Sequence, residues 1–269
     1  MQLIASDGRS HVSALRAEKG KDYVCPECGS LLRLKSGPSK QRHFFHPARS
    51  LRCRQSEKSL EHLHLQMRLE ALTGGEVECP FPAINRIADV AWHKRKIIFE
   101  IQCSPIALEE VKARNEDYRS AGYEVIWILH DKRFNRANVS ASEHYLRSIP
   151  CYFTNCNRDG KGVVYDQFEV LKDSRRLFKG PSIAVDLLKL ASPPEISPDG
   201  LPNVLLRRLK SWKWHAENDL LGRFITAPSK QMLQIEARFL KEELVRLPWH
   251  KLLAGTYRSL LDFLLKKSR

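Results

Sequence analysis

Two runs rich in β-branched and aromatic residues flank a short charged segment near the middle of the chain. Alternating apolar and polar positions of this kind are typical of β-strands. The charged segment between them is a turn by composition and reads His93-Lys94-Arg95-Lys96. The pattern therefore predicts a β-hairpin over residues 86–103, and the other elements are expected to be arranged around it.

Acidic side chains face one another in this predicted hairpin. If Lys94 and Arg95 are the central turn residues, Asp89 lies directly opposite Glu100. Opposite residues project from the same face with Cβ atoms about 5 Å apart, and Gln102 shares that face with Glu100. Like charges at this distance repel, but a divalent cation between them would make them ligands, and Mg²⁺ favours carboxylates. The alternative is a hairpin whose acids simply face water.

Helical and strand patterns continue on both sides of the hairpin. An apolar stripe at helical spacing predicts a helix over residues 56–73, which Gly74 and Gly75 end. Glu61 lies along one edge of that stripe, where an amphipathic helix usually meets water. A second helix is expected between residues 104 and 122, followed by an almost continuous apolar strand over 123–130. Strand, helix and strand in this order predict a parallel βαβ crossover.

Cysteine and histidine residues near the N-terminus have the spacing of a structural zinc site. Cys25 and Cys28 are the firmest pair of ligands, with two residues between them, and His46 is the expected third ligand. We predict His43 as the fourth ligand, with Cys53 as the alternative, because His43 and His46 would point to opposite faces of a strand. The competing interpretation is a reduced cysteine pair buried as small hydrophobic residues.

The second half of the chain carries weaker signals. Short strands are expected at residues 151–154 and 162–165, and residues 192–200 form a linker by composition. Three helices are expected beyond it, over residues 201–221, 230–247 and 249–267, with breaks at proline.

The net charge of +14 changes the functional picture, because it indicates a polyanionic partner. Nucleic acid fits better than a membrane surface, since no stretch of the chain is amphipathic in the way that binds lipid. No apolar run is long enough to span a bilayer either. Basic residues crowd an acid-free stretch between Glu27 and Glu57, which includes Arg49, Arg52 and Arg54. The odd cysteine count and the absence of a signal-peptide pattern favour a reducing cytoplasm.

A helix with Glu, a hairpin with Asp and Glu-x-Gln, and then a helix and a buried strand resemble the PD-(D/E)xK nuclease superfamily. The chain more closely resembles the CoiA family of bacterial competence proteins. The resemblance covers about residues 23–130 and rests on an ordered set of motifs: CPEC at 25–28, HFFH at 43–46, SLEH at 59–62, RIADV at 86–90, EIQCS at 100–104, Arg114 with Tyr118, and GYEVIWIL at 122–129.

The resemblance implies a fold and a set of roles. It implies an α/β fold with a mixed, restriction-endonuclease-like sheet, in which Glu61, Asp89 and Glu100 hold Mg²⁺ or Mn²⁺. Gln102 would then occupy the catalytic place usually held by Lys, which leaves cleavage less certain than metal and DNA binding. Arg114 and Tyr118 are expected to contact the DNA backbone, as are the basic residues at 49, 52 and 54.

The expected organisation has four segments: a zinc-binding β-rich module (1–55), a nuclease-like core (56–135), an irregular β and linker segment (136–200) and a basic helical region (201–269). The expected function is metal-dependent hydrolysis of DNA phosphodiester bonds during transformation or recombination. The alternative is a scaffold that binds single- or double-stranded DNA and helps to load a RecA-type recombinase. A zinc-finger regulator is disfavoured because no recognition helix follows the cysteine pair.

Overall fold

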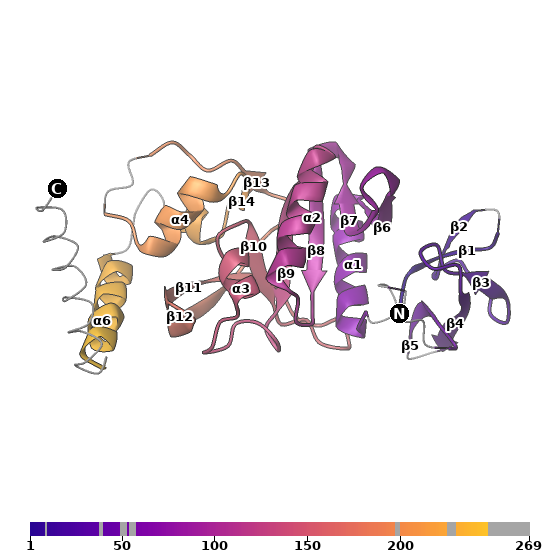
Figure 1. The fold of residues 1–269 in the computed structure, drawn as a ribbon, viewed down its shortest axis with the longest axis horizontal. Coiled ribbons are helices and arrows are strands. Elements are labelled where there is room, and N and C mark those ends of the chain that lie inside the picture. Colours follow the sequence, from indigo (N-terminus) through magenta and orange to yellow (C-terminus); the bar gives the residue numbers. More distant parts are fainter. Residues whose placement is uncertain are drawn as a thin grey trace, which may run out of the picture.

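The computed structural model describes residues 1–8, 10–37, 40–48, 53, 58–196, 200–224 and 230–246. Its elements are laid out along one long axis (Figure 1). A small N-terminal sheet lies at one end, a large mixed sheet lies in the middle, and the helices α4 (Asn203–Ser211) and α6 (Lys230–Arg246) lie toward the other end. A mixed α/β fold, as predicted, is confirmed.

The N-terminal sheet has the order β2-β1-β3-β4-β5, and all of its neighbouring strands are antiparallel. Its strands are β1 (Ile4–Ser6), β2 (His11–Ser13), β3 (Asp22–Val24), β4 (Leu31–Gly37) and β5 (Lys40–Phe45). Only a few large apolar side chains fill its core, chiefly Tyr23, Leu32 and Phe44, with Cys25 and Cys53 packed beside them. A core this small needs additional stabilisation, for which a bound metal is one source.

The central sheet has seven strands in the order β12-β11-β10-β9-β8-β7-β6. They are β6 (Glu76–Phe81), β7 (Arg86–Trp92), β8 (Ile97–Gln102), β9 (Glu124–His130), β10 (Cys151–Thr154), β11 (Val164–Lys172) and β12 (Arg175–Ala184). The strands β8, β9 and β10 are parallel, and the outer pairs are antiparallel. The predicted parallel crossover from β8 to β9 is confirmed.

Helices cover both faces of this sheet. Helix α1 (Leu60–Thr73) packs Leu65 and Leu69 against one face. Helix α2 (Leu108–Ser120) and the short α3 (Ala141–Leu146) pack Val111 and Leu146 against the other. Local signals set the limits of α1: the Ser59 hydroxyl accepts a hydrogen bond from the His62 N–H, and Gly74 ends the helix with φ 65°.

The hairpin of β7 and β8 has the predicted register. Val90 pairs with Phe99 and Trp92 with Ile97, and the regular pairing ends there, one position before the predicted pair of Asp89 and Glu100. The turn is a 3₁₀ segment over His93–Arg95, closed by Lys96 in the left-handed region at φ 55°. A second 3₁₀ turn, Pro82–Ile84, joins β6 to β7.

The chain beyond residue 135 contributes more to the sheet than the sequence predicted. The strand predicted at 151–154 is β10, and the next one begins at Val164 and runs to Lys172 in a long hairpin. Charged side chains interrupt the apolar pattern of this segment, so its sequence does not indicate a long strand. They are buried as ion pairs: Arg208 binds both oxygens of Asp166, and Arg147 donates to Glu169 at 2.7 Å.

The helix predicted over residues 201–221 is broken into two. After α4, residues His215–Ala216 (β14) pair with Leu190–Ala191 (β13), and Leu220–Phe224 form α5. The Tyr152 hydroxyl accepts a hydrogen bond from the Ala216 N–H, and this tertiary contact competes with helix continuation. The helix predicted over 230–247 is α6, whereas the one at 249–267 lies outside the described residues. No helix in the described part of the chain is long and apolar enough to cross a membrane.

Candidate functional site

A cavity of about 420 Å³ lies where the N-terminal end of α1 meets β7, the end of β8 and the segment after β9. Six basic side chains and two acidic ones line it. The acids are Glu61 and Asp89, and the bases are Lys58, Arg86, Arg114, Lys132, Arg133 and Arg158. Carboxylates surrounded by an excess of cations form a site suited to an anionic ligand that is bound together with a metal.

Asp89 lies at the point where β7 and β8 separate. The regular pairing of these strands ends at Val90 and Phe99, and beyond it the Asp89 carboxylate accepts a hydrogen bond from the Ile101 N–H at 2.9 Å. Its other oxygen lies 2.8 Å from His62 Nε2 and 3.0 Å from Lys58 Nζ. Burial raises the pKa of Asp89, but His62 and Lys58 outweigh that effect and hold the pKa far below its usual range. Asp89 is therefore ionised at neutral pH.

Lys58 connects the cavity to the N-terminal sheet. Its ammonium group lies 3.2 Å from the Glu78 carboxylate in addition to Asp89. Glu78, on β6, in turn accepts hydrogen bonds from the N–H groups of Leu3 and Ile4. Burial lowers the pKa of Lys58, but the two carboxylates outweigh it and the pKa is raised. Lys58 is thus a buried, charged link between the two sheets.

Glu100 is held on the other side of the hairpin by α2. Its side chain is 1% exposed, and its oxygens accept hydrogen bonds from Arg114 Nη1 at 2.6 Å and Tyr118 Oη at 2.8 Å. Burial raises the pKa of Glu100, and the nearby Asp89 carboxylate raises it further. Arg114 lowers it, but the pKa stays above its usual value. Arg114 also lines the cavity and donates to Glu110. Its contact with DNA stays a prediction, as does that of Tyr118.

Glu61 approaches the cavity from the first turn of α1. Its carboxylate lies 3.3 Å from Lys132 Nζ and 3.7 Å from Arg158 Nε. Burial raises the pKa of Glu61, but hydrogen bonds from its own N–H and from Ser59, together with Lys132, leave the pKa below its usual value. Gln102 also lines the cavity, but its amide donates to the Ser104 carbonyl at 2.7 Å, so it is engaged by its own loop.

The three predicted Mg²⁺ ligands are near one another but do not converge. Glu61 and Asp89 line one cavity, whereas the Glu100 carboxylate lies beneath its wall, between Arg114 and Tyr118. Among the described residues, they do not form a group of ligand atoms within 4.8 Å of one another. Their donor set, three carboxylates, still fits Mg²⁺. Cations occupy the positions around the acids, so a metal would have to replace ion pairs.

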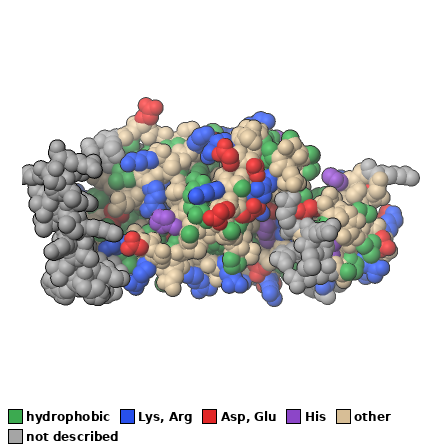
Figure 2. All heavy atoms as spheres, viewed as in Figure 1, with side chains coloured by type: hydrophobic (Ala, Val, Ile, Leu, Met, Phe, Trp, Pro, Cys, Tyr) green, Lys and Arg blue, Asp and Glu red, His purple; other side chains and the backbone are tan. Residues whose placement is uncertain are grey.

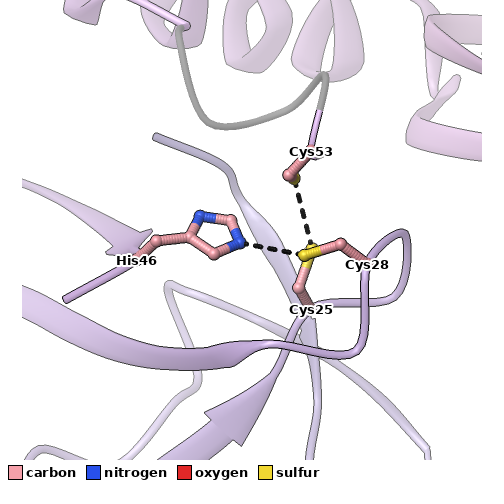
Figure 3. Close-up of side chains that lie close together, drawn as sticks. All are labelled: Cys25, Cys28, His46 and Cys53. Atoms are coloured by element: carbon pink, nitrogen blue, oxygen red, sulfur yellow. Dashed lines mark hydrogen bonds between the residues drawn. The ribbon is translucent and has the colours of Figure 1, made fainter. Parts of the chain in front are cut away.

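A second candidate metal centre lies in the N-terminal module (Figure 3). Cys25, Cys28, His46 and Cys53 place their ligand atoms within 4.8 Å of one another. Cys28 Sγ is 3.3 Å from His46 Nε2, and Cys25 Sγ is 3.6 Å from Cys53 Sγ. In tetrahedral zinc sites, ligand bonds of about 2.0–2.3 Å set sulfur–nitrogen and sulfur–sulfur separations of about 3.5 and 3.8 Å. The cluster can hold a metal such as zinc.

The structure corrects the predicted fourth ligand, because Cys53 takes the place given to His43. His43 lies within β5, where its Nδ1 is 2.8 Å from the Gln41 carbonyl. His46 follows the end of the strand and turns toward the thiols.

Some predicted residues lie outside the described part of the chain, and some contacts of the site were not predicted. Arg49, Arg52 and Arg54, predicted to bind DNA, lie outside the described residues. Conversely, Lys58 and Gln66 contact Asp89 without a sequence signal, since neither belongs to a recognisable spacing. The SLEH motif at 59–62 could be recognised in the sequence, but the contact of its His62 with Asp89 could not.

Two protein-family models match this chain. A family model of the competence protein CoiA N-terminal domain matches residues 6–56, and one of the CoiA nuclease-like domain matches residues 60–164. Together the two matches cover more than half of the 269 residues. The chain belongs to the CoiA family of competence proteins. The nuclease-like domain contains Glu61, Asp89 and Glu100, and the CoiA N-terminal domain contains the cysteine cluster. Neither the curated proteins nor the solved structures gave a match.

Proposed function

We propose that this CoiA-family protein is a metal-dependent DNA nuclease that hydrolyses phosphodiester bonds during transformation or recombination. One observation carries the proposal: two ionised carboxylates, Glu61 and Asp89, lie in the wall of a cavity that six Lys and Arg side chains also line. A phosphate group would be attracted by the cations, and a divalent metal bound by the acids would add to that attraction.

Each part of the site has a role in this proposal. Asp89, Glu61 and Glu100 are the Mg²⁺ or Mn²⁺ ligands. A bound divalent cation would lower the pKa of a water molecule and neutralise charge on the phosphate. Arg114 and the exposed Lys132 are positioned to bind phosphate oxygens. Gln102 offers a neutral donor in place of a cation. A positive charge beside the metal position would instead come from Lys58, whose buried ammonium group lies 3.0 Å from Asp89.

Basic residues elsewhere would hold the DNA more loosely. Lys and Arg side chains are spread among acidic ones over the visible face of the molecule (Figure 2) and are not gathered into one continuous patch. Sequence-independent contacts with the DNA backbone therefore depend on the cavity rim and on the overall charge of +14. Binding should weaken steeply with salt.

We further propose that the N-terminal cluster of Cys25, Cys28, His46 and Cys53 binds a structural Zn²⁺. The observation that supports it is the convergence of three thiols and one imidazole in a module with few large apolar side chains. Four protein ligands close the coordination shell, which is the pattern of a structural site and not of a catalytic one.

A cleavage assay tests the nuclease proposal. Circular single-stranded DNA and supercoiled plasmid are incubated with the purified chain and Mg²⁺ or Mn²⁺. Nicking is expected from the wild type and from Glu109→Gln, an exposed acid on α2 that serves as the matched control. Asp89→Asn and Glu100→Gln should lose it while retaining DNA binding by gel shift. The nuclease proposal fails if the wild type leaves both DNA forms intact with either metal.

A specific observation also favours the scaffold alternative. Without a metal, Asp89 is already neutralised by Lys58 and Glu100 by Arg114, so the site is electrostatically complete. In that case the domain holds DNA, and a RecA-type recombinase is the proposed partner. Transformation by an Asp89→Ala strain separates the two functions: an enzyme requires the carboxylate, whereas a scaffold would transform at the wild-type level.

A further inference from the structure

Three potential metal ligands meet at the outer edge of the central sheet, away from both sites described above. Glu76 and Cys79 lie on the edge strand β6, and His93 lies in the turn between β7 and β8. Their ligand atoms lie within 4.8 Å of one another. His93 Nε2 is 3.2 Å from the Glu76 carboxylate and 3.8 Å from Cys79 Sγ.

The imidazole of His93 is oriented by a second contact. Its Nδ1 lies 2.7 Å from the hydroxyl of Tyr123, a buried residue that packs edge-on against Phe81. When Nδ1–H donates to that hydroxyl, the lone pair of Nε2 points toward Glu76 and Cys79. Metal-binding histidines are characteristically oriented in this way through the nitrogen that does not bind the metal.

We propose that Glu76, Cys79 and His93 form a second Zn²⁺ site, separate from the N-terminal cysteine cluster. Zinc bonds of about 2.0–2.3 Å at a tetrahedral angle separate nitrogen from oxygen by about 3.3 Å and nitrogen from sulfur by about 3.5 Å. The two measured distances, 3.2 and 3.8 Å, are close to these values. A thiolate, an imidazole and a carboxylate suit zinc, while Mg²⁺ would reject the sulfur and nitrogen.

This site would connect the unpaired edge of the sheet to the hairpin turn. Glu76 and His93 are about half exposed, so an ion has a path from solvent, while Cys79 is buried beneath them. Three protein ligands leave the fourth position to water. Burial, with the nearby Glu76 carboxylate, raises the pKa of the Cys79 thiol to about 12. Zinc binding must displace that proton, so affinity should rise with pH.

The metal content of the full-length chain tests the proposal directly. After purification with excess Zn²⁺ and desalting, atomic emission should give two zinc ions per wild-type chain. It should give one per chain for His93→Gln, and two for Lys94→Gln, an exposed change in the same turn. Circular dichroism confirms that both variants are folded. Equal zinc content in the wild type and in His93→Gln would overturn the proposal.

Cobalt spectroscopy adds a readout of the ligands. The Cys28→Ser variant weakens the N-terminal cluster, and it should still take up one Co²⁺ with a sulfur-to-cobalt charge-transfer band and the visible bands of a tetrahedral ion. Adding Cys79→Ser should remove the charge-transfer band contributed by this site. A Mg²⁺-type carboxylate site gives no such band, so the nuclease proposal can fail without affecting this result. A band unchanged by Cys79→Ser would contradict the assignment.

Discussion

The anchoring of Glu100 by α2 can be tested by removing one oxygen atom. Tyr118 and Glu100 are each 1% exposed, and the tyrosine hydroxyl donates to the carboxylate at 2.8 Å. Tyr118→Phe deletes this donor and leaves the ring packing in place. The carboxylate keeps its ion pair with Arg114, so it stays buried with one fewer hydrogen bond.

The structure sets the size of the effect. A hydrogen bond to a charged group contributes about 1.5–3 kcal/mol, so Tyr118→Phe should lower the free energy of unfolding by about 2 kcal/mol. In a Glu100→Gln background the acceptor is neutral, and the same substitution should cost about 1 kcal/mol or less. The double-mutant cycle therefore predicts a coupling of about 1 kcal/mol or more between the two residues.

Urea unfolding of the four proteins measures this coupling. Because burial raises the pKa of Glu100, its charge appears only as the pH rises through that elevated pKa. The loss caused by Tyr118→Phe should accordingly be larger in alkaline than in acidic buffer. Equal losses in the wild-type and Glu100→Gln backgrounds, at every pH, would show that the hydroxyl does not support the carboxylate.

Three further predictions concern other parts of the molecule. Arg208→Met removes the cation that binds both oxygens of the buried Asp166, leaving only Arg147 at 3.8 Å, and should cost about 3–5 kcal/mol in urea unfolding. The change Lys210→Met, at an exposed position on the same helix, should alter stability by about 0.5 kcal/mol or less. Removing metal with a strong chelator should make the N-terminal module sensitive to protease while the central sheet resists; simultaneous digestion of both would argue against a metal-stabilised module. The affinity of the cavity for Mn²⁺, measured by calorimetry, should increase with pH because Glu100 must lose its proton to become a ligand; a flat profile would remove Glu100 from the ligand set.

Local sequence patterns predicted the central hairpin well for a physical reason. The short turn limits the registers that the two strands can adopt, and Val90 pairs with Phe99 as a turn centred on Lys94 and Arg95 predicts. The C-terminal end of α1 was predicted from Gly74, which acts within its own turn. The helix begins at Leu60, after the cap Ser59, and not at the predicted residue 56.

Contacts between distant residues could not be read in the same way. Lys58 reaches Glu78 and Asp89 only because α1 packs across the sheet. The long strand β11 has an irregular pattern because it buries Asp166 and Glu169, whose partners come from other elements. Ion pairs of this kind leave no periodicity in the chain.

The most direct test of the proposed active site is an anomalous difference map from crystals soaked in Mn²⁺. The nuclease proposal predicts a peak in the cavity within about 2.2 Å of oxygens of Asp89 and Glu61, with the Glu100 carboxylate drawn away from Arg114 toward the ion. A map without a peak there, at a Mn²⁺ concentration that supports DNA cleavage, would contradict the proposed metal site.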